Sequence, residues 1–391
     1  MYSDTRFGDL LKGLPRNFFN KAVAEHESDK HSKGFDSWDH LVAMIYVQLS
    51  GAAGLREIEA CFNGQSMHHY HLGSGDIKRS TLADANAKRS CEVFGTLCKE
   101  MLQQTHRQIR KELKSLLYLI DSTPISLKGL GYDNWTLQNH SHRTHGLKVH
   151  IMTAPNAAAP VYAQITAPNI NDIDEGKKIP LEKGATYVFD KGYCDYNWWY
   201  EIQQNGSKFV TRLKKNAAIT IVKQRPIAKN AQGIILEDAQ VCFKNRKPRG
   251  GCINHYHGTK LRKIVVHRPD KKTPMIIATN DFKRSALAIA ELYQQRWEIE
   301  LFFKWLKQNL KIKKFLGRSE NAVKIQIYTA LIAYVLVRAY RKRHGITQSM
   351  KICMVMLRTG LFQRPQTEQK EARKRRRRRK EQQQLQGALP I

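Results

Sequence analysis

The chain has 391 residues, of which 41% are hydrophobic, so it is long enough for two or three domains with buried cores. Lys and Arg number 66 against 34 Asp and Glu, and the segment from residue 366 onward supplies only a small part of the net charge of +32. A charge spread in this way causes self-repulsion that a polyanion relieves, which favours nucleic acid over an anionic membrane surface as the partner.

The termini and cysteines bear on where the protein works. Residues 1–13 are polar and mixed in charge, without the apolar core of a signal peptide. The most apolar run, residues 328–337, is too short to span a bilayer. The seven cysteines are scattered and odd in number, as is typical of reduced thiols. We therefore expect a cytoplasmic protein with no membrane partner.

Residues 1–110 are predicted to be helical. Apolar residues recur at helical spacing in three segments, which are Leu41–Leu49, Leu55–Phe62 and Val93–Leu102. Glycines between these segments would end each helix.

The segment from Ser80 to Arg89 resembles a recognition helix. Ser80 is a good N-cap, and small and basic residues follow it. Exposed side chains at Asn86, Lys88 and Arg89 could contact DNA. An ordinary solvated helix of a bundle explains the same pattern equally well.

From about residue 113 the pattern changes to short apolar runs. Five of these runs predict strands, which are Leu116–Ile120, Leu147–Met152, Val161–Ile165, Thr186–Phe189 and Phe209–Leu213. Two helices are predicted among them, within Ile173–Leu181 and Trp198–Gln204. This order predicts an α/β domain with a mixed sheet covered by helices. The first and fourth strands each end at an aspartate, Asp121 and Asp190.

A β-rich insertion at about 214–275 interrupts this domain. Its predicted strands are Ile219–Lys223, Ile234–Glu237, Val241–Lys244 and Ile264–His267. Met275–Ala278 is predicted to return to the main sheet, before a long helix from about Ser285 to Lys311 and an apolar helix over residues 322–340. The predicted domains are therefore a helical domain at 1–110, an α/β domain at 111–345, and a basic, disordered tail at 346–391.

The long helix carries a polar stripe on an otherwise apolar surface. At 100° per residue, Tyr293, Arg296, Glu300 and Lys307 fall within an arc of about 60°. Their neighbours are large and apolar, so the stripe is expected to line a site rather than to face solvent. The alternative is a solvated face in which Arg296 and Glu300 form an i,i+4 ion pair.

Glu300 could join Asp121 and Asp190 in a three-carboxylate metal site. Open sheets place their sites at the carboxyl ends of strands, where both aspartates are expected. Phosphodiester chemistry is served by two divalent ions about 4 Å apart, and hard ions such as Mg²⁺ prefer carboxylate oxygens. The residues therefore predict metal-dependent DNA strand cleavage, with Arg296, Lys307 and Tyr293 contacting phosphates.

The spacing Tyr293-x2-Arg296-x3-Glu300-x6-Lys307 resembles the Tyr-Arg-Glu-Lys signature of the IS-four family of bacterial insertion-sequence transposases. Residues 120–123 (Ile-Asp-Ser-Thr) and 189–193 (Phe-Asp-Lys-Gly-Tyr) resemble the first and second acidic motifs of that family. The likeness covers about residues 110–345. Residues 1–110 are more loosely similar to the helical N-terminal DNA-binding domain found in one branch of these proteins.

This resemblance implies a ribonuclease-H-like catalytic core with a β-rich insertion before the glutamate. It implies that Asp121, Asp190 and Glu300 are the catalytic triad and hold Mg²⁺ or Mn²⁺, as two ions. Tyr293, Arg296 and Lys307 would hold the terminal phosphates of the DNA. Trp297 could stack on a displaced base, although a core tryptophan is the more common role for such a residue.

The resemblance also implies cut-and-paste transposition of double-stranded DNA. The enzyme would cut at the terminal inverted repeats of its element and join the freed 3′-OH ends to target DNA. It would act as a homodimer assembled on DNA, in the bacterial cytoplasm and associated with the nucleoid. Two alternatives remain open, namely a metal-dependent nuclease or resolvase that does not join strands, and a DNA-binding regulator without catalysis.

Overall fold

The computed structural model describes residues 5–137, 145–247, 251–312, 314–364 and 377–378. The chain forms two compact units. One unit, Leu102–Lys307, contains all the strands of the described residues together with several helices. The other unit combines Met1–Met101 with Gln308–Ile391 and is helical in its described part.

The helical unit is built from both ends of the chain, which the predicted domains did not anticipate. Its helices are α1 (Arg6–Leu11), α2 (Arg16–Glu25), α3 (Ser37–Ser50), α4 (Leu55–Asn63), α5 (His69–Leu72), α6 (Arg79–Lys88), the first part of α7 (Cys91–Glu112), α13 (Glu320–Arg343) and α14 (Met350–Gly360). The helical segments predicted before residue 110 correspond to α3, α4, α6 and α7.

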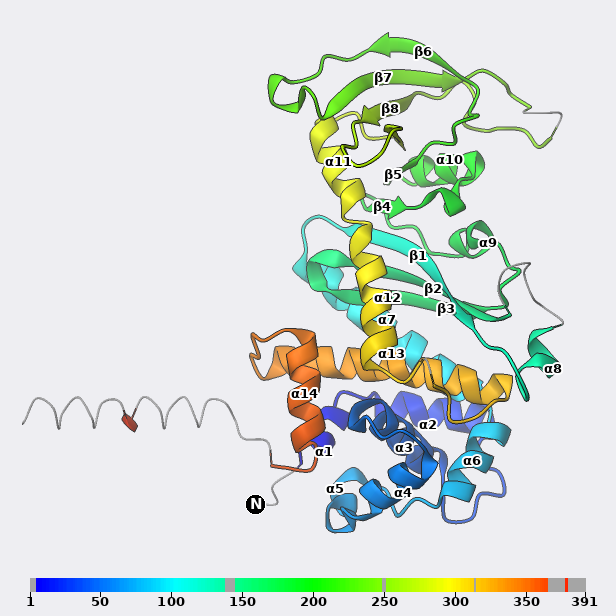
Figure 1. The fold of residues 1–391 in the computed structure, drawn as a ribbon, viewed down its shortest axis with the longest axis vertical. Coiled ribbons are helices and arrows are strands. Elements are labelled where there is room, and N and C mark those ends of the chain that lie inside the picture. Colours follow the sequence, from blue (N-terminus) through cyan, green and yellow to red (C-terminus); the bar gives the residue numbers. More distant parts are fainter. Residues whose placement is uncertain (1–4, 138–144, 248–250, 313, 365–376, 379–391) are drawn as a thin grey trace, which may run out of the picture. The chain divides into compact units, whose positions relative to one another are not determined.

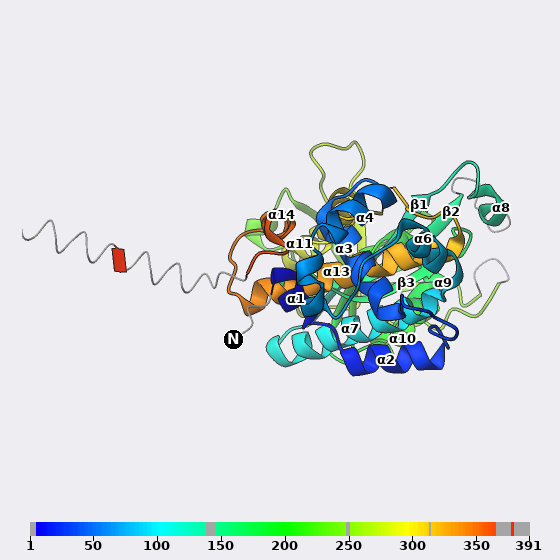
Figure 2. The same ribbon diagram turned by 90° about the horizontal axis from the view of Figure 1, so that it is seen from below.

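α3 and α13 lie side by side in this unit (Figures 1 and 2). Both helices are apolar and largely buried, so each covers the other. The Gln48 side chain of α3 donates to the Gln326 carbonyl oxygen of α13 at 3.1 Å. By length and composition α13 would pass as a membrane span, but 78% of its apolar window is buried within the protein, as in a core helix.

α13 lies within the predicted α/β domain at 111–345, but in the structure it packs in the same compact unit as the N-terminal helices. The predicted tail also begins too early. Residues 350–360 form α14, which buries Cys353, Met354 and Leu357. The basic run Arg373–Lys380 lies outside the described residues except for Arg377 and Arg378.

The α/β unit is organised around one nine-stranded sheet in the order β3-β2-β1-β4-β5-β9-β8-β7-β6 (Figure 1). Its strands are β1 (Leu117–Ser126), β2 (Gly146–Ala154), β3 (Ala159–Thr166), β4 (Thr186–Phe189), β5 (Lys208–Arg212), β6 (Ile219–Gln224), β7 (Ile235–Phe243), β8 (Leu261–Val266) and β9 (Met275–Thr279). β1 runs parallel to β4, and β4 runs parallel to β5, whereas every other pairing is antiparallel. The prediction of a mixed sheet is confirmed.

One face of this sheet is covered by α10 (Tyr196–Gln204) and the C-terminal part of α7. Trp198 and Trp199 of α10 are fully buried against an aromatic layer of the strands that includes Tyr187, Phe189 and Phe209. This layer fixes β4 and β5, which carry residues of the candidate site, in a rigid core.

The inserted strands extend the main sheet and do not form a separate one. β9 pairs with β5 on one side and with β8 on the other, as predicted for a strand returning to the sheet. β7 is a single strand where two had been predicted, with an irregularity between Ile235 and Glu237. The predicted inserted subdomain therefore shares the backbone hydrogen bonding of the central sheet.

The predicted long helix is divided in two. α11 (Ala286–Gln294) and α12 (Trp297–Asn309) are separated at residues 295 and 296. At the break, the hydrogen bonds Arg296 N to Tyr293 O (3.2 Å) and Glu298 N to Gln295 O (2.8 Å) have the shorter i→i−3 spacing. This spacing tightens the chain locally as in a 3₁₀ turn, a feature that often marks functional positions.

Candidate active site

Asp121, on β1, lies next to Asp190, which directly follows β4. The parallel register places Ile120 opposite Phe189, so the aspartates that follow these residues are neighbours. Asp190 follows the end of β4, as predicted. Asp121 does not end its strand, because β1 continues to Ser126 and beyond Ile120 pairs only with β2. The two carboxylates thus lie where β1 loses its neighbour on one side.

The residues of the polar stripe contact this part of the sheet. The Tyr293 hydroxyl donates to Asp190 Oδ1 at 3.2 Å. The Arg296 guanidinium donates to Asp121 Oδ2 at 3.3 Å through Nη1, and to Glu300 Oε1 through Nη2. Arg296 therefore joins a carboxylate of β1 to the carboxylate of α12.

Lys307 reaches β1 just beyond Asp121. Its ammonium group donates to the Thr123 hydroxyl at 2.6 Å and to the Pro124 carbonyl oxygen at 3.3 Å. All four stripe residues are thus directed toward the site despite the break between α11 and α12. The ion pair of Arg296 with Glu300, proposed as the alternative to a site, is present as well.

Burial and repulsion both act on Asp121. Its side chain is 18% exposed, and its pKa is raised from 3.8 to about 6, mainly because of burial. The Ser122 N–H and the Arg296 guanidinium oppose this rise, while the nearby carboxylates of Asp190 and Glu300 contribute to it. The three carboxylates are close enough to repel one another, and arginine guanidinium groups oppose that repulsion.

Asp190 has more partners and behaves differently. Burial raises its pKa, but the Lys191 N–H and the guanidinium groups of Arg212 and Arg296 outweigh this effect, so the pKa is lowered. Arg212 Nη2 and Nε donate to Asp190 Oδ1 at 2.8 and 3.1 Å. Arg212 was not predicted from the sequence to be a site residue. The signal that could have identified it is its position as a basic residue at the end of β5, the strand beside β4.

The donor set suits a hard divalent cation. Three carboxylates from separate elements supply the oxygen ligands that such ions prefer. Among the described residues, however, no group of three or more His, Cys, Asp and Glu side chains is already arranged to hold a metal ion. In the structure, Arg296 provides the positive charge between Asp121 and Glu300.

Trp297 is not a core residue. It is 58% exposed, next to Arg296 at the start of α12, and Leu301 one turn later is 48% exposed. The interpretation of Trp297 as a core tryptophan is therefore wrong. Its exposed ring is available for stacking.

The predicted recognition helix is present as α6, but its polar residues differ from expectation. Asn86 is 2% exposed and lies within hydrogen-bonding distance of His40. Arg89 is 12% exposed and donates to the Ser32 hydroxyl and the Phe35 and Asp36 carbonyl oxygens, so it holds the loop before α3. Only Lys88 is exposed, beside Asp84. Ser80 is not the N-cap, because α6 begins at Arg79.

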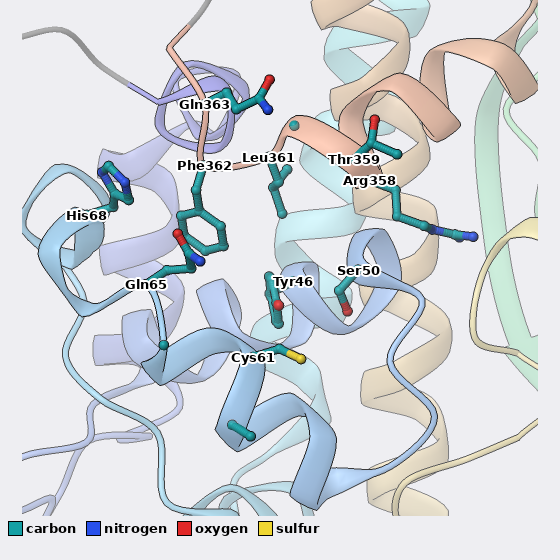
Figure 3. Close-up of a pocket in the computed structure, with 13 residues that line it drawn as sticks. Tyr46, Ser50, Cys61, Gln65, His68, Arg358, Thr359, Leu361, Phe362 and Gln363 are labelled. Carbon is teal, nitrogen blue, oxygen red and sulfur yellow. The ribbon is translucent and has the colours of Figure 1, made fainter.

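The helical unit contains a cavity of about 600 Å³, shown in Figure 3. Tyr46 and Ser50 of α3, Cys61 of α4, and Arg358 and Phe362 at and after the end of α14 are among its lining residues. None of the described residues that line it is acidic, so the cavity offers no carboxylate ligands to a metal ion.

Comparison with known families assigns two segments of the chain. The transposase DDE domain matches residues 112–336, which include all three carboxylates and the complete stripe. A domain of unknown function matches residues 3–74.

Curated relatives are similar over most of the chain. A putative transposase of Sinorhizobium fredii, y4zB, is 41% identical over 286 residues, covering 72% of this chain and 77% of the relative. The probable transposase of insertion sequence IS5377 from Geobacillus stearothermophilus is 27% identical, covering 66% of each protein. The putative transposase of insertion sequence IS4SA from Synechocystis is 26% identical, covering 68% of this chain and 73% of the relative.

Among solved structures, a piggyBac transposase synaptic complex with hairpin DNA aligns with a TM-score of 0.44 and 9% sequence identity. The alignment covers 90% of this chain and 77% of that protein.

Proposed function

This chain belongs to the family of transposase DDE domains, and from that premise we propose that Asp121, Asp190 and Glu300 are the carboxylates with which it cuts and joins DNA. The protein is a DNA transposase of the IS-four kind. One observation supports this assignment of residues most directly. A single guanidinium, that of Arg296, contacts Asp121 and Glu300 and lowers the pKa of Asp190.

DDE transposases use divalent metal ions, and the three carboxylates would hold two of them, Mg²⁺ or Mn²⁺. Such ions supply electrostatic stabilisation to phosphoryl transfer. The raised pKa of Asp121 is consistent with this proposal, because burial and, to a lesser extent, the Asp190 and Glu300 carboxylates disfavour its charged form, and added positive charge would favour that form.

Arg296 would then change partners. With cations at the carboxylates, its guanidinium is free to contact a DNA phosphate, for which its geometry is suited. Lys307 and the neutral Tyr293 hydroxyl would hold neighbouring phosphates. Burial raises the pKa of Tyr293 to about 12, so this hydroxyl remains a donor at neutral pH. Trp297 would stack on a base displaced from the duplex, which its exposure allows.

The proposed reaction is cut-and-paste transposition on a ribonuclease-H-like core. Hydrolysis at the terminal inverted repeats frees 3′-OH ends, and each 3′-OH then attacks a target phosphodiester and releases a target 3′-OH. Two protomers would assemble on two DNA ends. The helical unit would contact the repeats, with Lys88 as one exposed basic residue and Arg89 holding the adjoining loop. The net charge of +32 supports binding to double-stranded DNA. We expect this to take place at the nucleoid of a bacterial cytoplasm.

A cleavage and joining assay tests this function. Wild type would be compared with Asp190→Ala on DNA carrying the repeats that flank the gene, with Mg²⁺ and a target plasmid. We expect metal-dependent 3′-OH ends that join the plasmid, and neither product with Asp190→Ala, which should still bind the ends within a few-fold. Cleavage without joining would indicate a nuclease, and cleavage by Asp190→Ala would remove this residue from the site.

A further inference from the structure

Asp172, in the short helix α9 (Asp172–Gly176), is bound to the strand that carries Asp121. Its Oδ1 accepts a hydrogen bond from the Ser122 hydroxyl at 2.7 Å. The Asp172 side chain crosses from α9 to β1, whereas the N-cap residue of α9 is Asn171, which makes no side-chain cap hydrogen bond.

Ser122 connects Asp172 to the proposed metal ligand. The backbone N–H of Ser122 donates to Asp121 Oδ1 at 2.8 Å. Ser122 is therefore bonded to Asp172 through its hydroxyl and to Asp121 through its backbone N–H. A shift of Ser122 would move one oxygen of the Asp121 carboxylate.

Asp172 also lies against the turn that follows Asp190. This turn is η3 (Lys191–Tyr193), and a Cβ atom added to Gly192 would lie 2.9 Å from Asp172 Oδ2. α9 contacts the same turn a second time, since a Cβ atom at Gly176 would lie 2.9 Å from the ring of Tyr193. The second oxygen of Asp172 thus sets how closely the turn can approach.

The Asp172 carboxylate is itself held in place. Lys148 of β2 donates to Asp172 Oδ1 at 3.2 Å and to the Ile170 carbonyl oxygen at 2.6 Å. His150, two residues further along β2, lies 3.8 Å from the same oxygen. His150 is buried, and burial lowers its pKa to about 4, so it is neutral at physiological pH and Lys148 supplies the positive charge.

We propose that Asp172 is a positioning residue that fixes the separation of Asp121 and Asp190 so that together they can bind divalent cations. It contacts the residue after Asp121 and the turn after Asp190, and it touches neither carboxylate in the contacts that the structure shows. This inference rests on the proposed function of the three carboxylates. Residues that orient metal ligands in this way typically change metal affinity by 10- to 100-fold when they are replaced.

The test is direct calorimetric titration with Mn²⁺. The full-length protein would be bound to an end duplex that lacks the terminal 3′-OH, so that strand joining does not occur. We expect Asp172→Ala to weaken Mn²⁺ binding about 10- to 100-fold, with end binding and the thermal midpoint close to wild type. Asp172→Asn, which keeps an acceptor for Ser122, should recover part of the affinity. Asp174→Ala is the matched control on the same helix, because Asp174 is exposed and bonds only locally with Asn171.

Ser122→Ala provides a second route if Asp172→Ala fails to fold. This substitution removes only the hydroxyl that donates a hydrogen bond to Asp172, and it should also weaken Mn²⁺ binding. Wild-type affinity in either folded variant would overturn the positioning role. Asp121→Ala separates this failure from failure of the proposed function. If wild type binds no Mn²⁺, or if Asp121→Ala binds it as wild type does, the metal site itself is wrong and the inference falls with it.

Discussion

Arg262 and Arg296 each contact carboxylates, but their surroundings differ. Arg262 is 1% exposed and forms a two-point contact with Asp238, at 2.9 and 2.7 Å, and Asp238 is 3% exposed. Arg296 is 16% exposed and divides its two contacts between Asp121 and Glu300, which are 18% and 35% exposed. The first pair has matched charges, whereas the second cluster has more carboxylates than cations. Matched and buried charges hold the sheet together, while unmatched charges near solvent remain able to exchange partners.

The largest effect is expected from Glu300→Ala, which changes the carboxylates around Arg296. Removing one of three carboxylates should lower the rate of strand cleavage by about 10³-fold or more, because metal ions contribute several kcal/mol to such reactions. Folding stability should stay near the wild-type value, since the variant also removes a repelling charge. Single-turnover cleavage and urea denaturation measure the two effects. Cleavage at the wild-type rate would exclude Glu300 from catalysis.

Arg262→Ala should instead act mainly on folding stability. It leaves Asp238 buried beside only Arg225, at 3.5 Å, and removes the hydrogen bonds to the carbonyl oxygens of Asp281 and Arg284. We expect a loss of about 3–5 kcal/mol in the free energy of unfolding, measured by urea denaturation. Arg296→Ala is the matched control and should cost less, because its partners reach solvent. Equal losses would contradict the distinction between the two clusters.

The pH dependence of stability tests the unmatched charge at Asp121. The pKa of Asp121 is higher in the folded protein than its ordinary value of 3.8, so the folded state binds more protons between pH 3.8 and about 6. Its contribution to stability is therefore present below pH 3.8 and is lost as the pH rises to about 6, by up to about 3 kcal/mol. Asp121→Asn should flatten this part of the profile in metal-free urea denaturation. An unchanged profile would mean that the pKa of Asp121 is not raised by burial and by the neighbouring carboxylates.

The smallest effect is expected from Lys307→Ala. Lys307 contacts Thr123 and Pro124 in the free protein and is proposed to contact one phosphate in the complex. End binding should weaken a few-fold for all sequences, and the slope of log affinity against log salt should fall by about 1. Fluorescence anisotropy over a salt series measures both, with exposed Lys304 replaced as the control. A slope that equals wild type would argue against a phosphate contact.

The sequence was sufficient for most of the sheet and for the residues that meet at the site. Short runs ending at Asp121 and Asp190 located two neighbouring strands because apolar strand runs are local signals. The stripe on α11 and α12 could be identified because helical spacing alone brings Arg296 and Glu300 together. Both predictions depend on residues close in sequence.

What the sequence did not reveal depends on distant contacts. The exposure of Trp297 and the burial of Asn86 are set by which neighbours pack on their helices, and local pattern does not encode this. The apolar pattern of α13 predicts a buried helix, but it does not show that the helix packs against α3, which lies far away in the sequence. The contacts of Arg212 and Asp172 are made with strand and turn neighbours that are distant along the chain.

The construction of the helical unit from both ends of the chain has a consequence for synthesis. A ribosome releases α3 early, but its partner α13 follows only after the whole α/β unit has been made. The α/β unit can fold as a nascent domain, whereas α3 keeps an uncovered apolar surface until α13 has emerged. A gene copy truncated before Glu320 would therefore yield a chain whose first helices cannot complete their core and that is prone to aggregation and degradation. Folding of the helical unit thus requires that the whole sequence between α3 and α13 has been translated.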